Sequence, residues 1–125
     1  MLDRAEKITI AGVEYNLVLT TRATKEISAR YGGLEMLGDR LANSDNMIDA
    51  LSEVVWLVTL LANQGVMIDN LQSGANKQLL TADVVELLTS PADFADYKDA
   101  IMAAMIKGTK RHVESDGASK NAQVG

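Results

Sequence analysis

Few residues of this sequence could catalyse a reaction or bind a metal ion, and those few are scattered along the chain. Three aspartates, Asp93, Asp96 and Asp99, recur every three residues, and carboxylates are the ligands that divalent cations such as Ca²⁺ prefer. On a helix this spacing spreads the three side chains over a wide arc, and charged runs on helices usually face solvent. We therefore expect a solvated helix face at this position and no metal site.

Catalysis by a nucleophile and a base is not indicated either, because it requires a Ser, Thr or Cys beside a base that a third group orients. The chain has one histidine, His112, and no cysteine. This histidine follows Lys110 and Arg111, a basic cluster typical of a helix C-terminus, where cations complement the helix dipole. Gly32-Gly33 lacks the flanking signature of a phosphate-binding loop. No spacing indicates catalysis by carboxylates alone, so we expect no catalytic residue, no cofactor and no enzyme.

The composition predicts a single helical domain. A chain of 125 residues can bury a core without disulfides or metals. Apolar residues make up 47% of the chain but aromatic residues only 4%, so the core must be largely aliphatic, which favours helix packing over a β-sandwich or barrel. The absence of cysteine fits a reducing compartment.

The charge distribution predicts a cytoplasmic protein that binds neither nucleic acid nor membrane. The net charge is −5, and residues 35–106 carry eleven carboxylates against only Arg40, Lys77 and Lys98. Such a surface repels phosphate backbones. The charged segment Met1–Lys7 is unlike a signal peptide. The apolar run Val54–Leu61 is far shorter than the roughly 20 residues of a membrane span.

The segment Met47–Ala62 predicts an apolar helix around which the other elements pack. Its large apolar residues that share one broad arc are Met47, Ile48, Leu51, Val54, Val55, Leu57, Val58 and Leu61. Trp56 and Leu60 fall instead among polar residues on the opposite side. Two interpretations stay open: another helix, such as the C-terminal one, covers them, or they form a protein interface, where aromatic anchors are enriched. Two courses stay open at Asn63-Gln64-Gly65: the helix continues through Val66, Met67 and Leu71, or it breaks or kinks there and a new helix begins.

Residues 7–19 predict a β-hairpin, because apolar and polar residues alternate in two runs around Ala11-Gly12. A two-residue turn there would pair Ile10 with Val13 and Ile8 with Tyr15, with all four side chains on one face. An isolated hairpin is marginal in water, so this face must lie on helices or against another subunit. Because a two-stranded hairpin also has two unpaired edges, these four residues form a second candidate interface.

The remaining segments complete a mainly α fold, in which the N-terminal β-hairpin precedes a compact bundle of four to six helices around the central apolar helix. Helix-start signals are Thr20 or Thr21, the polar loop Asn43-Ser44-Asp45, Thr81, and Ser90-Pro91. We expect one domain over residues 1–113. Residues 114–125 lack apolar periodicity and are expected to form a disordered tail.

The segment Ile8–Gly33, ITIAGVEYNLVLTTRATKEISARYGG, resembles the tail assembly chaperones of long-tailed bacteriophages and prophages of Gram-positive hosts. The residues that carry the resemblance are Gly12, Tyr15 and Leu17 of the hairpin, and Ala23, Lys25, Ile27, Tyr31 and Gly32 of the helix after it. The resemblance extends over roughly residues 6–112.

This resemblance implies a non-enzymatic viral protein of the host cytoplasm that forms homo-oligomers. Such a protein coats the tape-measure protein while the tail tube assembles. Two alternatives stay open. One is another phage structural component, such as a head–tail connector, and the other is a small helical regulatory or antitoxin-like binding protein.

Overall fold

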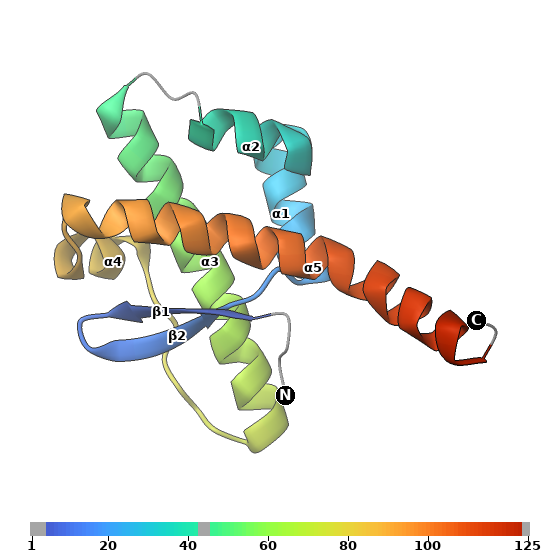
Figure 1. The fold of residues 1–125 in the computed structure, drawn as a ribbon. Coiled ribbons are helices and arrows are strands. Elements are labelled where there is room, and N and C mark those ends of the chain that lie inside the picture. Colours follow the sequence, from blue (N-terminus) through green and yellow to red (C-terminus); the bar gives the residue numbers. More distant parts are fainter. Residues whose placement is uncertain (1–4, 43–45, 124–125) are drawn as a thin grey trace.

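The structure, a computed structural model, describes the backbone of residues 5–42 and 46–123 and the side chains of residues 5–41 and 46–109. It is mainly helical, and an N-terminal antiparallel hairpin precedes five α-helices, which confirms the predicted fold class (Figure 1). The elements are β1 Glu6–Ile10, β2 Val13–Leu17, α1 Thr21–Tyr31, α2 Leu34–Ala42, α3 Met47–Ser73, α4 Ala82–Leu88, the 3-10 helix η1 Pro91–Asp93, and α5 Phe94–Gln123.

Capping side chains set most helix starts where the sequence predicts them. The Thr20 hydroxyl accepts a hydrogen bond from the backbone N–H of Ala23 at 3.0 Å, and α1 ends at Gly32 in the left-handed conformation (φ 89°). The cap of α3 differs from the prediction. It is Asn46, whose side-chain oxygen accepts from the N–H groups of Ile48 and Asp49, whereas residues 43–45 lie outside the described residues.

Helix α3 continues through Gly65 as a single helix to Ser73, which is one of the two courses that the sequence left open. Gly65 allows strand β2 to approach α3 closely, because the strand crosses the helix at this residue. A Cβ at Gly65 would lie 2.3 Å from the carbonyl oxygen of Asn16. Next to this crossing the Val18 N–H donates to the Leu61 carbonyl at 3.2 Å. Gly74, with φ of 76°, then ends the helix.

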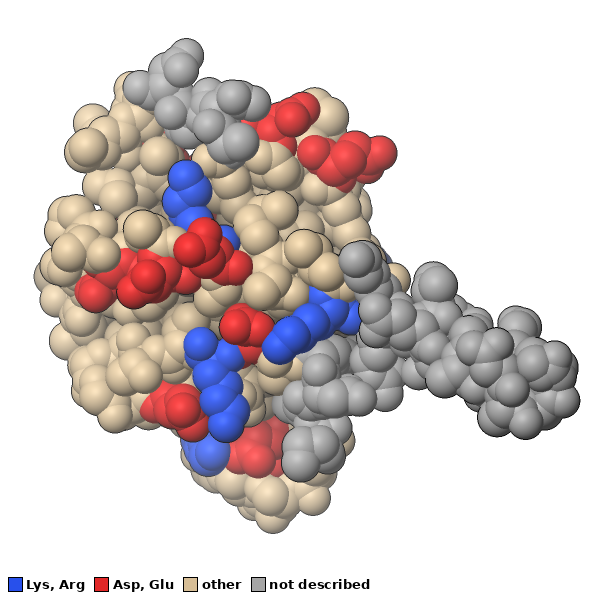
Figure 2. Space-filling view, in the orientation of Figure 1, with Lys and Arg blue, Asp and Glu red and all other residues tan. Residues whose placement is uncertain are grey.

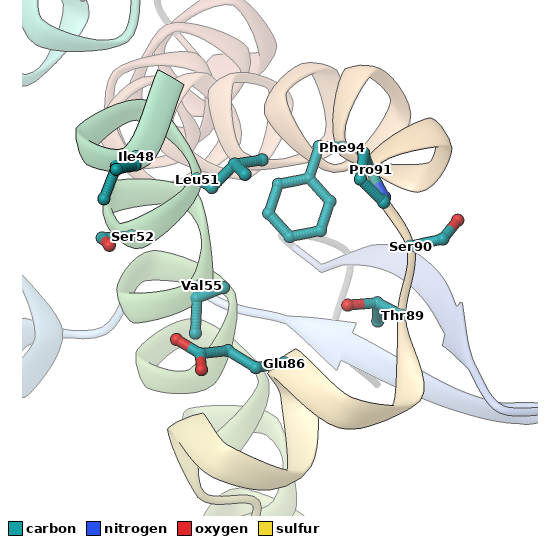
Figure 3. A pocket seen from close by; sticks show the side chains of 9 residues that line it. All are labelled: Ile48, Leu51, Ser52, Val55, Glu86, Thr89, Ser90, Pro91 and Phe94. Atoms are coloured by element: carbon teal, nitrogen blue, oxygen red, sulfur yellow. The ribbon is translucent and has the colours of Figure 1, made fainter. Parts of the chain in front are cut away.

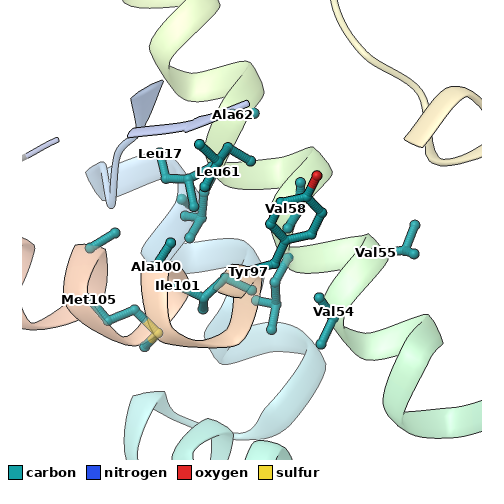
Figure 4. Close-up of a cluster of buried hydrophobic side chains, with 14 of the residues drawn as sticks. Leu17, Val54, Val55, Val58, Leu61, Ala62, Tyr97, Ala100, Ile101 and Met105 are labelled. Carbon is teal, nitrogen blue, oxygen red and sulfur yellow. The ribbon is translucent and has the colours of Figure 1, made fainter. Parts of the chain in front are cut away.

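Helix α3 lies at the centre of the fold and packs against β2, α1, α2, α4 and α5 (Figure 1). The hairpin rests on α3 through β2 and on α5 through β1. Figure 4 shows side chains of α3, α5 and β2 meeting in one buried cluster, to which Val58, Leu61, Ile101 and Leu17 each contribute a side chain with no exposed surface. Burying one such side chain stabilises the fold by about 1.5–3 kcal/mol.

The first turn of α3 departs from the predicted apolar arc. Met47 and Ile48 are each 73% exposed, although the periodicity placed them with the core residues. In Figure 1 the N-terminal end of α3 extends beyond α5. The arc becomes buried only from Val54 onward.

Helix α5 continues to Gln123, whereas the sequence predicted a helix ending near residue 113 and a disordered tail over 114–125. The only proline of the chain is Pro91, so nothing in the later sequence forces the helix to stop. Figure 1 shows the C-terminal part of α5 extending away from the other elements. Residues 124–125 lie outside the described residues.

Helix α3 has the length and the apolar composition of a helix that could cross a membrane, which no single apolar run of the sequence had indicated. Half of its most apolar window is buried inside the protein, and the core helix of a soluble protein meets the same criteria. The expected absence of membrane association therefore stays a prediction.

Candidate protein-binding surface

Helix α4 exposes most of its apolar side chains. Of its four large apolar residues only Val85 is buried, whereas Val84, Leu87 and Leu88 are 38%, 83% and 52% exposed. A helix of this length is not stable alone. Val85 packs it into the core beside α3, and its own cap, the Thr81 hydroxyl, accepts from the N–H of Val84 at 3.2 Å. Clustered exposed apolar side chains mark interaction sites.

An apolar groove of about 300 Å³ lies between the N-terminal half of α3 and the segment that runs from α4 through η1 into α5. We call it the α4 groove. It is lined by Ile48, Leu51, Ser52 and Val55 on α3 and by Glu86, Thr89, Ser90, Pro91 and Phe94 opposite. In Figure 3 the side chain of Leu51 points across the groove toward the Phe94 ring.

The wall of the α4 groove opposite α3 is positioned by η1 and the start of α5. The backbone N–H of Ser90 donates to the Asp93 carboxylate at 2.9 Å, and Pro91 occupies the first position of η1. Phe94 follows directly, with its ring centre 5.8 Å from that of Tyr97, which is buried in the core. The cap that the sequence predicted thus fixes the aromatic side chain that lines the groove.

The surroundings of the α4 groove are acidic. Segments 48–55 and 82–98 together carry one cation, Lys98, and six carboxylates, of which Glu53 is neutralised by Arg30 and Arg40: Asp49, Glu53, Asp83, Glu86, Asp93 and Asp96. The exposed carboxylates of Asp49, Asp83 and Glu86 form no ion pair within the described part of the chain. Figure 2 shows acidic side chains along the first half of α5, where Asp96 and Asp99 lie. The groove therefore offers apolar walls and an unneutralised negative rim.

Trp56 and Leu60 are half-buried on the side of α3 that faces α1, where both pack against the core. They line a second groove, of about 310 Å³, together with Met67 and Leu79 and with Arg22 and Glu26 of α1 at its edge. Helix α1, rather than the C-terminal helix, therefore covers this side of α3. Part of each side chain stays accessible in the groove, so their role as an interface stays a prediction.

A polar and aromatic cluster surrounds Trp56. The Arg30 guanidinium lies 4.4 Å from the centre of the Trp56 ring, and the Tyr31 ring meets that ring edge-on with the centres 6.0 Å apart. Glu53 accepts hydrogen bonds from the Tyr31 hydroxyl and the Arg30 Nε and pairs with Arg40 at 3.6 Å. Burial, followed by the hydrogen bond to Glu53, raises the pKa of Tyr31 to about 12.

Sequence reasoning missed this cluster because its members come from three different helices. Glu53 fell among the polar residues of α3, and nothing local linked it to Arg30 or Arg40. The available signal was one acid in the middle of a very apolar helix, whose side chain is only 14% exposed here. A carboxylate buried to this extent requires ion-pair or hydrogen-bond partners.

The hairpin has the predicted register, with Ile10 opposite Val13 and Ile8 opposite Tyr15. The four side chains do not form one exposed patch, however. Ile8 and Ile10 are 7% and 2% exposed and belong to the core of the chain itself, so they cannot contact a partner in this conformation. Val13, at the tip, is 52% exposed, and Tyr15 is half-buried. Only these two stay in the interface hypothesis.

The sheet has only two strands, and contacts within the chain occupy part of each outer edge. On the β1 side the Tyr97 hydroxyl donates to the Thr9 carbonyl at 3.0 Å, and Lys107 donates to the Ala5 carbonyl at 3.1 Å. On the β2 side the carbonyl of Asn16 lies against Gly65 of α3. These contacts occupy one carbonyl on the outer edge of each strand, so pairing of the remaining edge groups with a second chain stays a prediction.

The three aspartates do not form a metal site in the described residues, which contain no group of three or more metal-ligating side chains. Asp93 is engaged in the cap of η1, and Asp96 and Asp99 line a shallow hollow beside β1. The side chain of His112 lies outside the described residues.

Comparisons of this chain with protein-family models, with curated proteins and with solved structures give no significant match.

Proposed function

We propose that this chain is a non-enzymatic assembly protein of the tail-chaperone type, which self-associates and binds a tape-measure protein in the host cytoplasm. The observation that carries the proposal is the exposed apolar surface of α4 and the first turn of α3 beside the α4 groove. The resemblance of Ile8–Gly33 to tail assembly chaperones supplies the class of partner.

The exposure pattern supports a binding role. Leu87, Ile48 and Met47 are each more than 70% exposed, and they lie on the two helices that form the groove. Single exposed apolar residues are common, but exposed apolar residues on two helices beside one apolar groove, of which Ile48 lines the groove, favour a binding patch. An isolated folded domain gains nothing from such a patch, whereas a chaperone requires one to hold an unassembled chain.

Self-association is the second part of the proposal, and the Trp56–Leu60 groove is its candidate surface. It has an apolar floor and side chains of both signs, Arg22 and Glu26, at its edge. Because a two-fold contact places the same patch on both subunits, such a mixed edge can pair with itself. We expect sedimentation velocity at about 100 µM to show oligomers, since weak interfaces associate in this range. A monomer there would contradict this part.

The test of the function has two steps: a search for a tape-measure gene directly downstream of this gene, and co-expression of this chain with the protein that such a gene encodes. We expect a soluble complex that survives size-exclusion chromatography, and we expect Leu87→Ser with Leu88→Ser to weaken it. Leu71→Ser is the matched control, because Leu71 is 85% exposed near the opposite end of α3. Failure to form any complex would contradict the proposal. Retention of this chain in purified phage particles would favour a structural component instead.

A further inference from the structure

We infer that the α4 groove binds a basic amphipathic helix of the partner protein, with apolar side chains in the groove and Lys or Arg side chains at its rim. This inference rests on the proposed function and adds the chemistry of the segment that is recognised. It comes from the combination of apolar walls with carboxylates that lack ion-pair partners.

The walls suit the apolar face of a helix. Leu51 and Val55 lie one turn apart on α3, and Phe94 faces them from the start of α5. Helix-in-groove recognition uses anchors spaced three or four residues apart on the bound helix, which then occupy successive positions of one groove. A volume of about 300 Å³ holds a few such side chains, not a whole folded domain.

The rim selects the charge of the bound helix. Glu86 lines the groove, Asp83 lies one turn before it on α4, and Asp49 lies one turn before Ser52 on α3. All three carboxylates are exposed, and none forms an ion pair within the described residues. The only cation on these segments is Lys98, one turn beyond Phe94, and it does not line the groove. Complementary charge at a rim raises association rates and excludes like-charged partners.

The same charges argue against a second copy of this chain as the occupant. The apolar helix that a copy exposes is α4 itself, whose charged side chains are Asp83 and Glu86. Inserting it would bring carboxylates against carboxylates, which costs affinity. The second groove differs, because Arg22 and Glu26 both lie at its edge. Self-association and partner binding are thereby assigned to different surfaces.

The first experiment measures binding of two synthetic peptides by fluorescence anisotropy. Both have about 16 residues, enough to form a helix on binding, with leucine at helical spacing on one face. One carries lysines beside the leucines, and the other carries glutamates at the same positions. We expect the lysine peptide to bind at least about tenfold more tightly. Equal affinities would overturn the charge selection.

Two exposed substitutions locate the binding site. Ile48→Ser shortens the apolar wall, and Glu86→Lys reverses the charge of the rim, and each should weaken lysine-peptide binding by about tenfold. Their matched controls are Leu71→Ser, also an exposed apolar residue of α3, and Asp39→Lys, an exposed acid of α2. The controls should bind as the wild type does. Equal loss in variant and control would reveal general attraction to an acidic protein and overturn the site.

The same variants separate this inference from the proposed function. If the tape-measure complex forms with wild type and also with both groove variants, the groove assignment is wrong while the function stands. If no complex forms with wild type, the function fails and the peptide measurements alone decide the groove. If Ile48→Ser instead converts an oligomer to a monomer, the occupant is a second copy and the inference is overturned.

Discussion

The guanidinium of Arg30 lies 4.4 Å from the centre of the Trp56 ring, so helix α1 covers the aromatic residue that the sequence left without a neighbour. The Tyr31 ring packs against the same indole edge-on. Trp56 is therefore part of the contact between α1 and α3 before any partner binds, and its replacement should affect the fold itself.

We expect Trp56→Ala to lower the free energy of unfolding by about 2–3 kcal/mol, less than for a fully buried tryptophan. Urea denaturation followed by circular dichroism measures this change. Leu71→Ala is the control and should change stability by less than about 0.5 kcal/mol, because Leu71 is 85% exposed. Unchanged stability of Trp56→Ala would contradict its role in the fold, and a lower mass in sedimentation at unchanged stability would assign the residue to the interface alone.

The Tyr31 hydroxyl should make stability depend on alkaline pH. Burial, and then its hydrogen bond to Glu53, raise the pKa from 10.0 to about 12. Because the folded-state pKa lies above the unfolded value, the stabilisation is complete below about pH 10 and is lost as the pH rises toward 12. Tyr31→Phe should be less stable at about pH 8 by roughly 1 kcal/mol and should lose less on alkalinisation than wild type. Parallel urea midpoints across this range would contradict the assignment.

Glycine 65 should be intolerant of a side chain. A Cβ there would lie 2.3 Å from the Asn16 carbonyl oxygen, so Gly65→Ala forces β2 and α3 apart and should cost more than about 2 kcal/mol. Gly38→Ala is the matched control, since Gly38 lies inside α2 with no atom within 4 Å of the added Cβ. That substitution should stabilise by about 0.5–1 kcal/mol. Similar thermal midpoints for the two variants would contradict the crossing.

Residues 114–125 should be dispensable for folding, because Figure 1 shows this end of α5 extending away from the other elements up to residue 123. Truncation after Val113 should leave the thermal midpoint within about 2 °C. Truncation after Ala100 is the contrasting variant, since it removes Ile101 and Met105 from the core and should abolish folding. A larger drop for the first truncation would mean that the C-terminal end docks on the protein.

The hairpin and most helix starts could be predicted because the information is local. Alternation of apolar residues and the Ala11-Gly12 turn fix the register, and Thr20, Thr81 and Ser90 are caps that act within three residues of their own position. A pattern confined to a few neighbours survives in any fold that contains the segment.

The α4 groove and the course of α3 could not be predicted, because both depend on residues far apart in sequence. In the sequence, Gly65 indicates a break in an apolar helix. Only the structure shows that the Asn16 carbonyl lies against this glycine. Likewise, a helix of seven residues has too few turns for its periodicity to show that Val85 faces the core while Leu87 faces outward. The contacts of Glu53 could not be predicted either, because they join residues of three helices, α1, α2 and α3.

Binding of the tape-measure protein through α4 and the first turns of α3 is tested most directly by hydrogen–deuterium exchange of this chain, free and in complex with the co-expressed partner. We expect slower exchange in the complex over residues 82–88 of α4 and over the first turns of α3, where the exposed apolar side chains lie. Exchange near Gly74, at the far end of α3, should not change. A complex that leaves α4 unprotected, or no complex at all, would contradict the account.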